Sequence, residues 1–317
     1  MEVKTKMSQF LRRVIRISAE DSPNIQLARK QIAEGLEPTD ETAIPGILTW
    51  SELEKRRSTW DRVRQCIGLD GQFWEGAEVL LFPPEWLNRA EQVDRGLRES
   101  RIERQAKAIG IDPAEGGDRT AMAVVDELGL IELVSKRTPD TAVITGEALA
   151  FMQRWKVEPE RVVFDRGGGG KEHADRLRSQ GWPVRSVSFA ETFQVEPRRG
   201  LVMVEERKEV REERYAYRNR RAEMYGNLRQ LLDPAVNPQG FGIGREEVEL
   251  RRQLAPIPLT YDGEGRLELL PKSKREGGTG KCLIDLIGHS PDEADALVLA
   301  IHGMQTKSSR VVVRSMV

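Results

Sequence analysis

From residue 108 onward the chain alternates between short apolar runs and glycine-containing turns, which is typical of strands in a buried sheet. Three apolar runs follow one another with only turns between them. Two later runs are each preceded by a segment with helical spacing of its apolar residues. The predicted strands cover 108–112, 120–125, 130–136, 161–165 and 184–189, and the predicted helices cover about 138–156 and 171–180.

This order of elements predicts an α/β fold. Three strands joined by turns form an antiparallel meander, and strands separated by helices add to it in parallel through crossover connections. The combination describes a ribonuclease-H-like mixed sheet flanked by helices. Other α/β folds begin in a similar order, so the order alone does not exclude them.

Residues 1–98 have a different pattern, helical in places and interrupted by prolines. A helix is predicted over 51–66, and four of the six tryptophans lie in this part of the chain. We therefore predict two domains: a mostly helical or irregular segment over 1–98, and the ribonuclease-H-like domain over 99–317.

Composition excludes several classes of protein. The chain of 317 residues is 38% hydrophobic and 32% charged, which is typical of a charge-rich globular protein. No apolar run approaches the roughly 18 residues that a membrane span needs. Two cysteines and three histidines, all far apart, do not form a zinc-binding pattern.

Charge gives only a local indication of a nucleic-acid partner. The 50 basic and 51 acidic residues nearly cancel. The segment 196–221 is rich in both signs, with a slight basic excess, and Arg220 and Arg221 close it. A solvated helix face explains such a run equally well.

Aspartates end two of the predicted strands. Asp112 closes the first and Asp165 closes the fourth, and in the predicted sheet these strands are neighbours. Ligands of α/β sheets bind beyond the carboxyl ends of the strands. Two carboxylates close together stay ionised only with a cation between them, and oxygen ligands suit Mg²⁺ or Mn²⁺. Taken alone, Asp112 could also be an exposed turn residue.

A predicted helix near the C-terminus carries two further acids. Its start, Ser290–Pro291–Asp292–Glu293, reads as a capping box in which Glu293 has a structural role. Asp292 and Asp295 are three residues apart and share a helix face. Since the following residues are nearly all apolar, this helix should pack flat on the sheet and place both acids over the strand ends.

Basic residues accompany two glycine-rich segments. Gly167–Gly170 lie between Arg166 and Lys171, and their lack of side chains could let a polyanion approach Asp165, although a turn without ligand explains them as well. The segment 277–282, GGTGKC, lacks the spacing of a phosphate-binding loop. It reads instead as a basic loop able to hold phosphates, with Lys272, Lys274 and Lys281.

Four motifs together resemble the C-terminal nuclease of the large terminase subunit of tailed bacteriophages, a protein that pumps DNA into the capsid and cuts it. They are GIDPAEGGDRTAMAVVD, VVFDRGGGGKEHADRL, NRRAEMYGNLRQLL and SPDEADALVLAI, in the family's order over 108–304. Residues 1–98 are similar to the end of the ATPase domain and its linker. No phosphate-binding loop precedes them, so we do not expect ATPase activity from this chain.

The resemblance implies a site and a reaction. Matched motif by motif, the metal-ligating and catalytic acids are Asp112, Asp165 and Asp295, with Asp118 and Asp292 as further candidates. They would hold two Mg²⁺ or Mn²⁺ ions for hydrolysis of phosphodiester bonds in concatemeric double-stranded DNA, with Asp112 bridging both ions. His289 could orient a water or a ligand, or be purely structural. Arg220 and Arg221 open a helix that could follow the DNA backbone.

The implied partners are double-stranded DNA, the terminase small subunit, the portal protein and the ATPase domain of the full-length subunit. The resemblance does not imply binding to a membrane. The implied place of action is the host cytoplasm, at the procapsid portal. Three alternatives stay open at this point: a stand-alone resolvase or ribonuclease-H-like nuclease, a non-catalytic DNA clamp or portal-docking module, and an actin-like ATPase.

Overall fold

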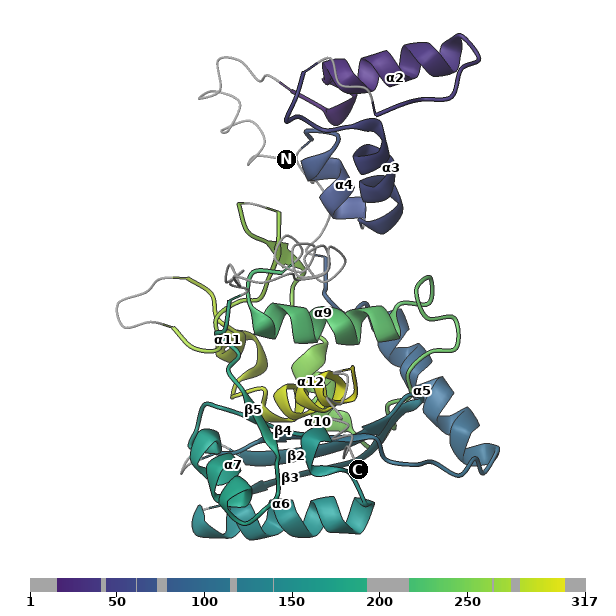
Figure 1. Cartoon of the computed structure of the whole chain (residues 1–317). Helices are drawn as coiled ribbons and strands as arrows, with labels where there is room; N and C mark the ends of the chain where they lie inside the picture. The colour runs from purple at the N-terminus through teal and green to yellow at the C-terminus, as the bar shows by residue number, and fades with distance from the viewer. Residues whose placement is uncertain are drawn as a thin grey trace, which may run out of the picture. The chain divides into compact units, whose positions relative to one another are not determined.

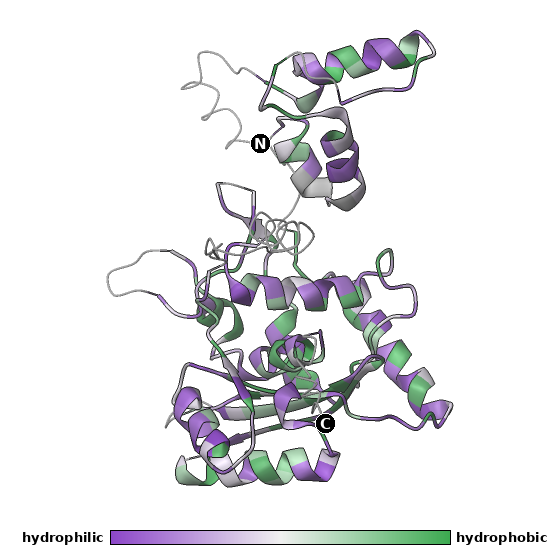
Figure 2. Ribbon diagram, in the orientation of Figure 1, coloured by the Kyte–Doolittle hydropathy of each residue, from purple (hydrophilic) through white to green (hydrophobic). Residues whose placement is uncertain are grey.

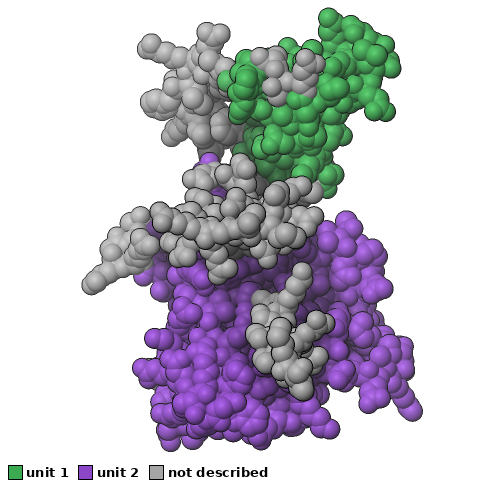
Figure 3. Space-filling model, viewed as in Figure 1, with its two compact units in different colours: residues 1–79 green, residues 80–317 purple. Residues whose placement is uncertain are grey.

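The chain divides into two compact units, Met1–Val79 and Leu80–Val317 (Figure 3). The computed structural model describes residues 16–40, 44–60, 62–72, 79–114, 119–138, 140–192, 217–263, 265–274 and 280–305. The division falls before the predicted boundary at residue 98. Helix α5 (Pro84–Glu99) belongs to the second unit, where Arg89 donates to the carbonyl of Asn237 and Glu91 pairs with Arg251.

The first unit is built from short helices, in agreement with its interrupted pattern. Their bounds are η1 Ala19–Asp21, α2 Pro23–Ala33, α3 Trp50–Thr59 and α4 Arg62–Gly68. The single helix predicted over 51–66 is thus two helices. A small core of Ile25, Leu53 and Leu69 holds the unit together.

The second unit contains a five-stranded mixed sheet in the order β3-β2-β1-β4-β5 (Figure 1). Its strands are β1 Ala108–Asp112, β2 Arg119–Asp126, β3 Gly129–Arg137, β4 Val162–Asp165 and β5 Arg185–Val187. β1, β2 and β3 pair antiparallel, whereas β1, β4 and β5 pair parallel. This confirms the predicted ribonuclease-H-like fold.

Helices cover both faces of this sheet (Figure 1). On one face lie α6 (Ala142–Trp155) and α7 (Gly170–Ser179), and on the other lies α12 (Asp292–Gln305) with α9 (Arg220–Leu232) and α10 (Val248–Leu254) behind it. The remaining elements are η2 Pro159–Arg161, α11 Leu283–Ile287 and a two-stranded sheet of β6 Thr260–Tyr261 and β7 Leu267–Glu268. Among the helices that the structure describes, none has the length and apolarity of a membrane span.

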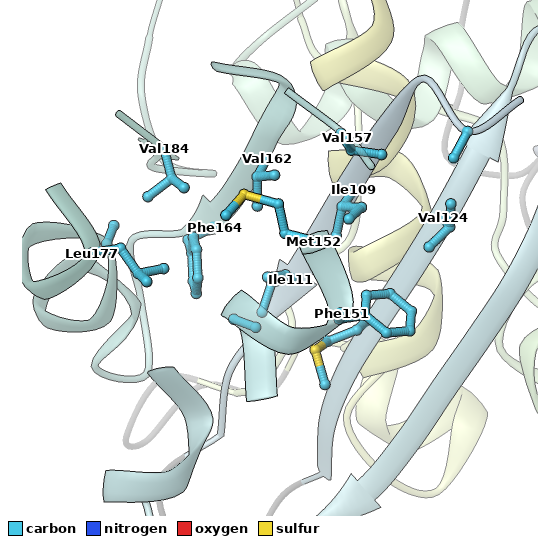
Figure 4. Packing of buried hydrophobic residues seen from close by; sticks show 14 residues of the cluster. Ile109, Ile111, Val124, Phe151, Met152, Val157, Val162, Phe164, Leu177 and Val184 are labelled. Atoms are coloured by element: carbon cyan, nitrogen blue, oxygen red, sulfur yellow. The ribbon is translucent and has the colours of Figure 1, made fainter. Parts of the chain in front are cut away.

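Side chains alternate between the two faces of the central strands, as the pleat of a strand requires. Ile109 and Ile111 of β1 join Phe164 of β4 in a core with Phe151 and other residues of α6 and α7 (Figure 4). Of the two helices in this layer, α6 is the more apolar, and α7 is largely hydrophilic (Figure 2). By the same alternation, Asp112 and Asp165 lie on the opposite face, under α12.

Helix α12 lies directly on β1 because Gly110 has no side chain. A Cβ atom at Gly110 would meet the carbonyl oxygen of Ala296 at 2.0 Å and the nitrogen of Ala300 at 2.3 Å. This close approach buries α12 from Asp292 through Gly303. The first turn of the helix is thereby held over the ends of β1 and β4, where the aspartates lie.

Replacing Gly110 with alanine should therefore destabilise the second unit severely. The added methyl group collides with helix backbone rather than with a movable side chain, so we expect a loss of about 3 kcal/mol or more in the free energy of unfolding. The matched control is Gly146→Ala in α6, where an added Cβ meets nothing within 4 Å. That variant should gain about 0.5–1 kcal/mol. Urea denaturation of both variants measures the difference, and equal stability of the two would contradict the packing described here.

Candidate metal centre

Two aspartates stand side by side at the carboxyl ends of neighbouring parallel strands. Ile111 of β1 pairs with Phe164 of β4, so Asp112 and Asp165, the next residue on each strand, end the strands at the same level. Asp112 is 4% exposed, whereas Asp165 is half-buried. The strand ends thus supply two acids to one edge of the sheet, as the sequence predicts.

The first turn of α12 brings Asp292 and Asp295 to the same place, and a lysine lies between the acids. The Lys272 Nζ atom is 3.7 Å from Asp112 Oδ2, 3.5 Å from Asp292 Oδ1 and 3.5 Å from Asp295 Oδ2. The Lys272 loop is fixed by backbone hydrogen bonds to the start of α11, since Ile284 donates to the carbonyl of Lys272 at 3.1 Å. One ammonium group therefore joins three carboxylates from two parts of the chain.

Burial determines the electrostatics of this cluster. Loss of solvent raises the pKa of Asp112 well above its usual range, and the nearby acids Asp295, Asp165 and Asp292 raise it further, while Lys272 opposes them. For Lys272, burial acts against the charged form, but the three acids outweigh it and raise its pKa. Asp112 Oδ2 is buried and has no hydrogen-bond partner within the described residues. When this carboxyl is ionised, a buried oxygen without a donor favours a nearby cation.

The loop of four glycines is shaped around Asp165. Burial raises the pKa of Asp165, and the backbone N–H of Gly167 lowers it by hydrogen bonding. A Cβ atom at Gly170 would meet the carbonyl oxygen of Asp165 at 1.9 Å, and Gly168 has a positive φ of 55° beneath the carbonyl of Pro113. The glycines are thus needed for the loop's own packing. Arg166 and Lys171, at its two ends, are exposed.

Helix α9 contributes two residues to the cluster. Arg221 is buried and its NH2 atom lies 3.0 Å from Asp295 Oδ1, and the Tyr225 hydroxyl donates to the same oxygen at 2.7 Å. Burial and Asp295 raise the pKa of Tyr225, so its hydroxyl stays protonated. The DNA-binding role predicted for Arg221 does not fit this position, because the side chain is inside the protein. Tyr225 was not predicted to take part at all.

The other predicted residues lie outside the cluster. His289 contacts Glu249 at 2.7 Å and the carbonyl of Ser290 at 2.7 Å. Lys274 pairs with Asp285 at 3.1 Å, and Arg220 pairs with Glu223 at 2.6 Å. Lys281 is exposed. Asp118 and most of the charged segment 196–221 fall outside the described residues.

The start of α12 differs from the predicted capping box. The Ser290 hydroxyl donates to Asp292, which also accepts from the backbone N–H of Arg119 at 3.1 Å. Glu293 hydrogen-bonds Ser135 of β3 instead of closing the box. These two donors fix the side chain of Asp292 beside β2. Its carboxylate therefore both contacts Lys272 in the acidic cluster and links the start of α12 to the sheet.

The residues present fit a hard divalent cation. The buried carboxylates of Asp112, Asp292 and Asp295 and the half-buried Asp165 offer oxygen atoms, and Oδ2 of Asp112 has Lys272 as an ion-pair partner but no hydrogen-bond donor among the described residues. Within the described residues, no three His, Cys, Asp or Glu side chains already stand at metal-binding spacing. Lys272 is the cation that contacts Asp112, Asp292 and Asp295 in this structure. An ion would therefore take the place of the ammonium group.

Among the proteins compared with this chain, solved structures show a similar fold. No protein-family model matches the sequence, and no curated protein matches it. A solved structure of the nuclease domain of the large terminase subunit gp2 of bacterial virus Sf6 is 18% identical, with a TM-score of 0.52 over 73% of this chain and 100% of that chain. A mutant of that domain with manganese is also 18% identical, with a TM-score of 0.52 over 71% of this chain and 99% of that chain. The chain thus shares the fold of a phage terminase nuclease domain.

Removing the positive charge of Lys272 should destabilise the protein in the absence of metal. Lys272→Met leaves Asp112, Asp292 and Asp295 without their shared cation, and we expect a loss of about 1–3 kcal/mol in the free energy of unfolding at mildly alkaline pH. Added Mn²⁺ should restore more stability to this variant than to the parent, because the ion no longer competes with the ammonium group. Thermal unfolding with and without MnCl₂ measures both effects.

The matched control is Lys274→Met, two residues away, which pairs with the exposed Asp285. This variant should behave like the parent in both conditions. An equal response of the two variants to Mn²⁺ would mean that Lys272 does not occupy the place of the ion.

Proposed function

We propose that this chain is a metal-dependent endonuclease that hydrolyses phosphodiester bonds of double-stranded DNA during viral genome packaging. The observation that carries the proposal is the convergence of three buried carboxylates on one ammonium group at the strand ends of a ribonuclease-H-like sheet. Similarity to terminase nuclease domains, one of them solved with manganese, supports the same activity.

Asp112, Asp165 and Asp295 are the proposed ligands of two Mg²⁺ or Mn²⁺ ions, with Asp292 as a further ligand. Bound ions of this kind lower the pKa of water and stabilise charge on the leaving oxygen. The protein's own contribution is to bury Asp112, to fix Asp295 from α9 and to hold Asp165 within its glycine loop. Hydrolysis of this type needs no nucleophilic side chain.

DNA is proposed to bind through its phosphates. Exposed Arg166 and Lys171 lie at the two ends of the loop beside Asp165, and Lys274 and Lys281 lie on the segments that flank residues 275–279. Arg220, partly exposed at the start of α9, is a further candidate. Contacts of this kind give affinity that falls with salt and little sequence preference.

The wider role follows from the family resemblance. We propose that the substrate is concatemeric DNA, and that the partners are the small terminase subunit, the portal protein and the ATPase domain of a full-length subunit. The reaction would take place in the host cytoplasm at the procapsid portal. The first unit, 1–79, and α5 are the proposed end of the ATPase domain and its linker.

Plasmid cleavage by the whole chain tests this proposal. Supercoiled plasmid should be nicked and linearised with Mn²⁺ or Mg²⁺ and left intact with EDTA. Parallel reactions on linear duplex, a four-way junction and an RNA–DNA hybrid identify the substrate class. Cleavage restricted to the junction or the hybrid would favour the resolvase or ribonuclease alternative. DNA binding without cleavage by either ion would favour the non-catalytic clamp.

Asp112→Asn and Asp165→Asn should each reduce cleavage by at least about a hundredfold, since loss of a residue that only supports a metal ligand already costs about 10–100-fold. Both variants should fold, because asparagine keeps the shape of the side chain and removes a repelling charge. The matched control is Asp175→Asn, an exposed acid on α7 that pairs with Arg178. It should cleave like the parent. Parental activity in Asp165→Asn would remove that residue from the proposed site.

A further inference from the structure

The two oxygens of Asp295 have different surroundings. The side chain is fully buried. Oδ1 accepts from the Tyr225 hydroxyl at 2.7 Å and from Arg221 at 3.0 Å. Oδ2 has the longer contact with Arg221, at 3.3 Å, and lies 3.5 Å from Lys272 Nζ. One oxygen therefore faces α9 and the other faces the centre of the acidic cluster.

The hydrogen-bonding capacity of Oδ1 is already used. A carboxylate oxygen has about two lone-pair sites, and the two donors from α9 fill both of them. A cation that approached Oδ1 would have to displace a charged, buried guanidinium or a buried hydroxyl. Oδ2 faces Lys272, and this is the direction from which an ion in the place of the ammonium group would approach. Asp295 can thus offer a single oxygen to an ion at the place of the ammonium group.

Both donors are held in place by their own packing. Tyr225 is fully buried, with its ring 6.4 Å from that of Phe82. The Arg221 guanidinium lies 5.6 Å from the ring of Phe189 and 5.4 Å from the ring of Tyr225. The start of α9 is capped by the Asn219 side chain, which accepts from the backbone N–H of Ala222 at 2.9 Å. Neither donor can rotate away without disturbing these contacts.

We propose that Tyr225 and Arg221 are positioning residues that restrict Asp295 to ligation through Oδ2 alone, and that this restriction selects Mg²⁺ or Mn²⁺ over Ca²⁺. Ca²⁺ takes 6–8 oxygen ligands and readily accepts both oxygens of a carboxylate, whereas Mg²⁺ requires an octahedron with one oxygen from each ligand. If only one oxygen of Asp295 can bind the ion, Ca²⁺, the larger ion, loses the advantage of a ligand that uses both oxygens. The proposal rests on the metal-binding function of Asp295 proposed above.

Metal binding to Tyr225→Phe, without DNA, tests the proposal. Mn²⁺ affinity is measured by electron paramagnetic resonance of the free ion, and Ca²⁺ affinity by competition against Mn²⁺. The variant keeps the buried ring and loses one donor to Oδ1. We expect its Mn²⁺ affinity to fall about tenfold, and its preference for Mn²⁺ over Ca²⁺ to shrink by a similar factor. A loss of packing alone would lower the affinity for both ions equally and leave the preference for Mn²⁺ over Ca²⁺ unchanged.

Two further variants complete the test. Arg221→Lys keeps the positive charge but loses the planar guanidinium that lies beside the rings of Phe189 and Tyr225. It should hold Oδ1 less firmly and so also reduce the preference, and it serves as the main variant if Tyr225→Phe loses its cooperative unfolding. Tyr261→Phe, in the small sheet, is the control and should match the parent. An unchanged preference in both site variants overturns this inference alone. A parent chain that binds no Mn²⁺ overturns the proposed metal site and this inference with it.

Discussion

The site depends on one electrostatic constraint: several buried carboxylates lie close together where little solvent screens the repulsion between their charges. Two unit charges about 4 Å apart repel by roughly 4 kcal/mol at an effective dielectric constant near 20. The Lys272 ammonium group relieves this repulsion by contacting Asp112, Asp292 and Asp295 together. Burial and the neighbouring acids raise the pKa of Asp112 even though Lys272 opposes them, so without a cation at that point one or more of the acids would take up a proton.

Small residues make this arrangement possible. Gly110 lets α12 lie against β1, and Gly303, near the other end of the helix, would place a Cβ atom 2.8 Å from the carbonyl of Arg161. Since α12 is close to the sheet along its length, its first turn cannot move away from the strand ends. The acids of α12 are therefore held beside Asp112 by close backbone packing along the helix.

Sequence patterns could predict those features that depend on one segment at a time. Strand order followed from apolar runs and turns, and it placed Asp112, Asp165 and the acids of α12 at one edge of the sheet. Lys272 and Arg221 were predicted to bind phosphates. The sequence of a basic segment does not distinguish an exposed lysine or arginine from one whose side chain is buried. Tyr225 gave no signal, since helical spacing groups it with core residues. Contacts between distant segments decide these three positions, and the pattern of a single sequence does not reveal such contacts.

The charges in the cluster constrain how ions can occupy it. Among the described residues, Asp112, Asp165, Asp292 and Asp295 bring four negative charges when all are ionised, while Lys272 and Arg221 bring two positive charges. With Lys272 in place, one divalent ion would balance this charge, and a second would leave an excess of two positive charges in a largely buried site, which is costly. If the proposed ion takes the place of the Lys272 ammonium group, the four acids and Arg221 leave three negative charges, so one ion leaves one negative charge and two ions leave one positive charge. Withdrawal of Lys272 would therefore let the cluster accept a second ion at a lower electrostatic cost, and a DNA phosphate would offset the positive charge that remains.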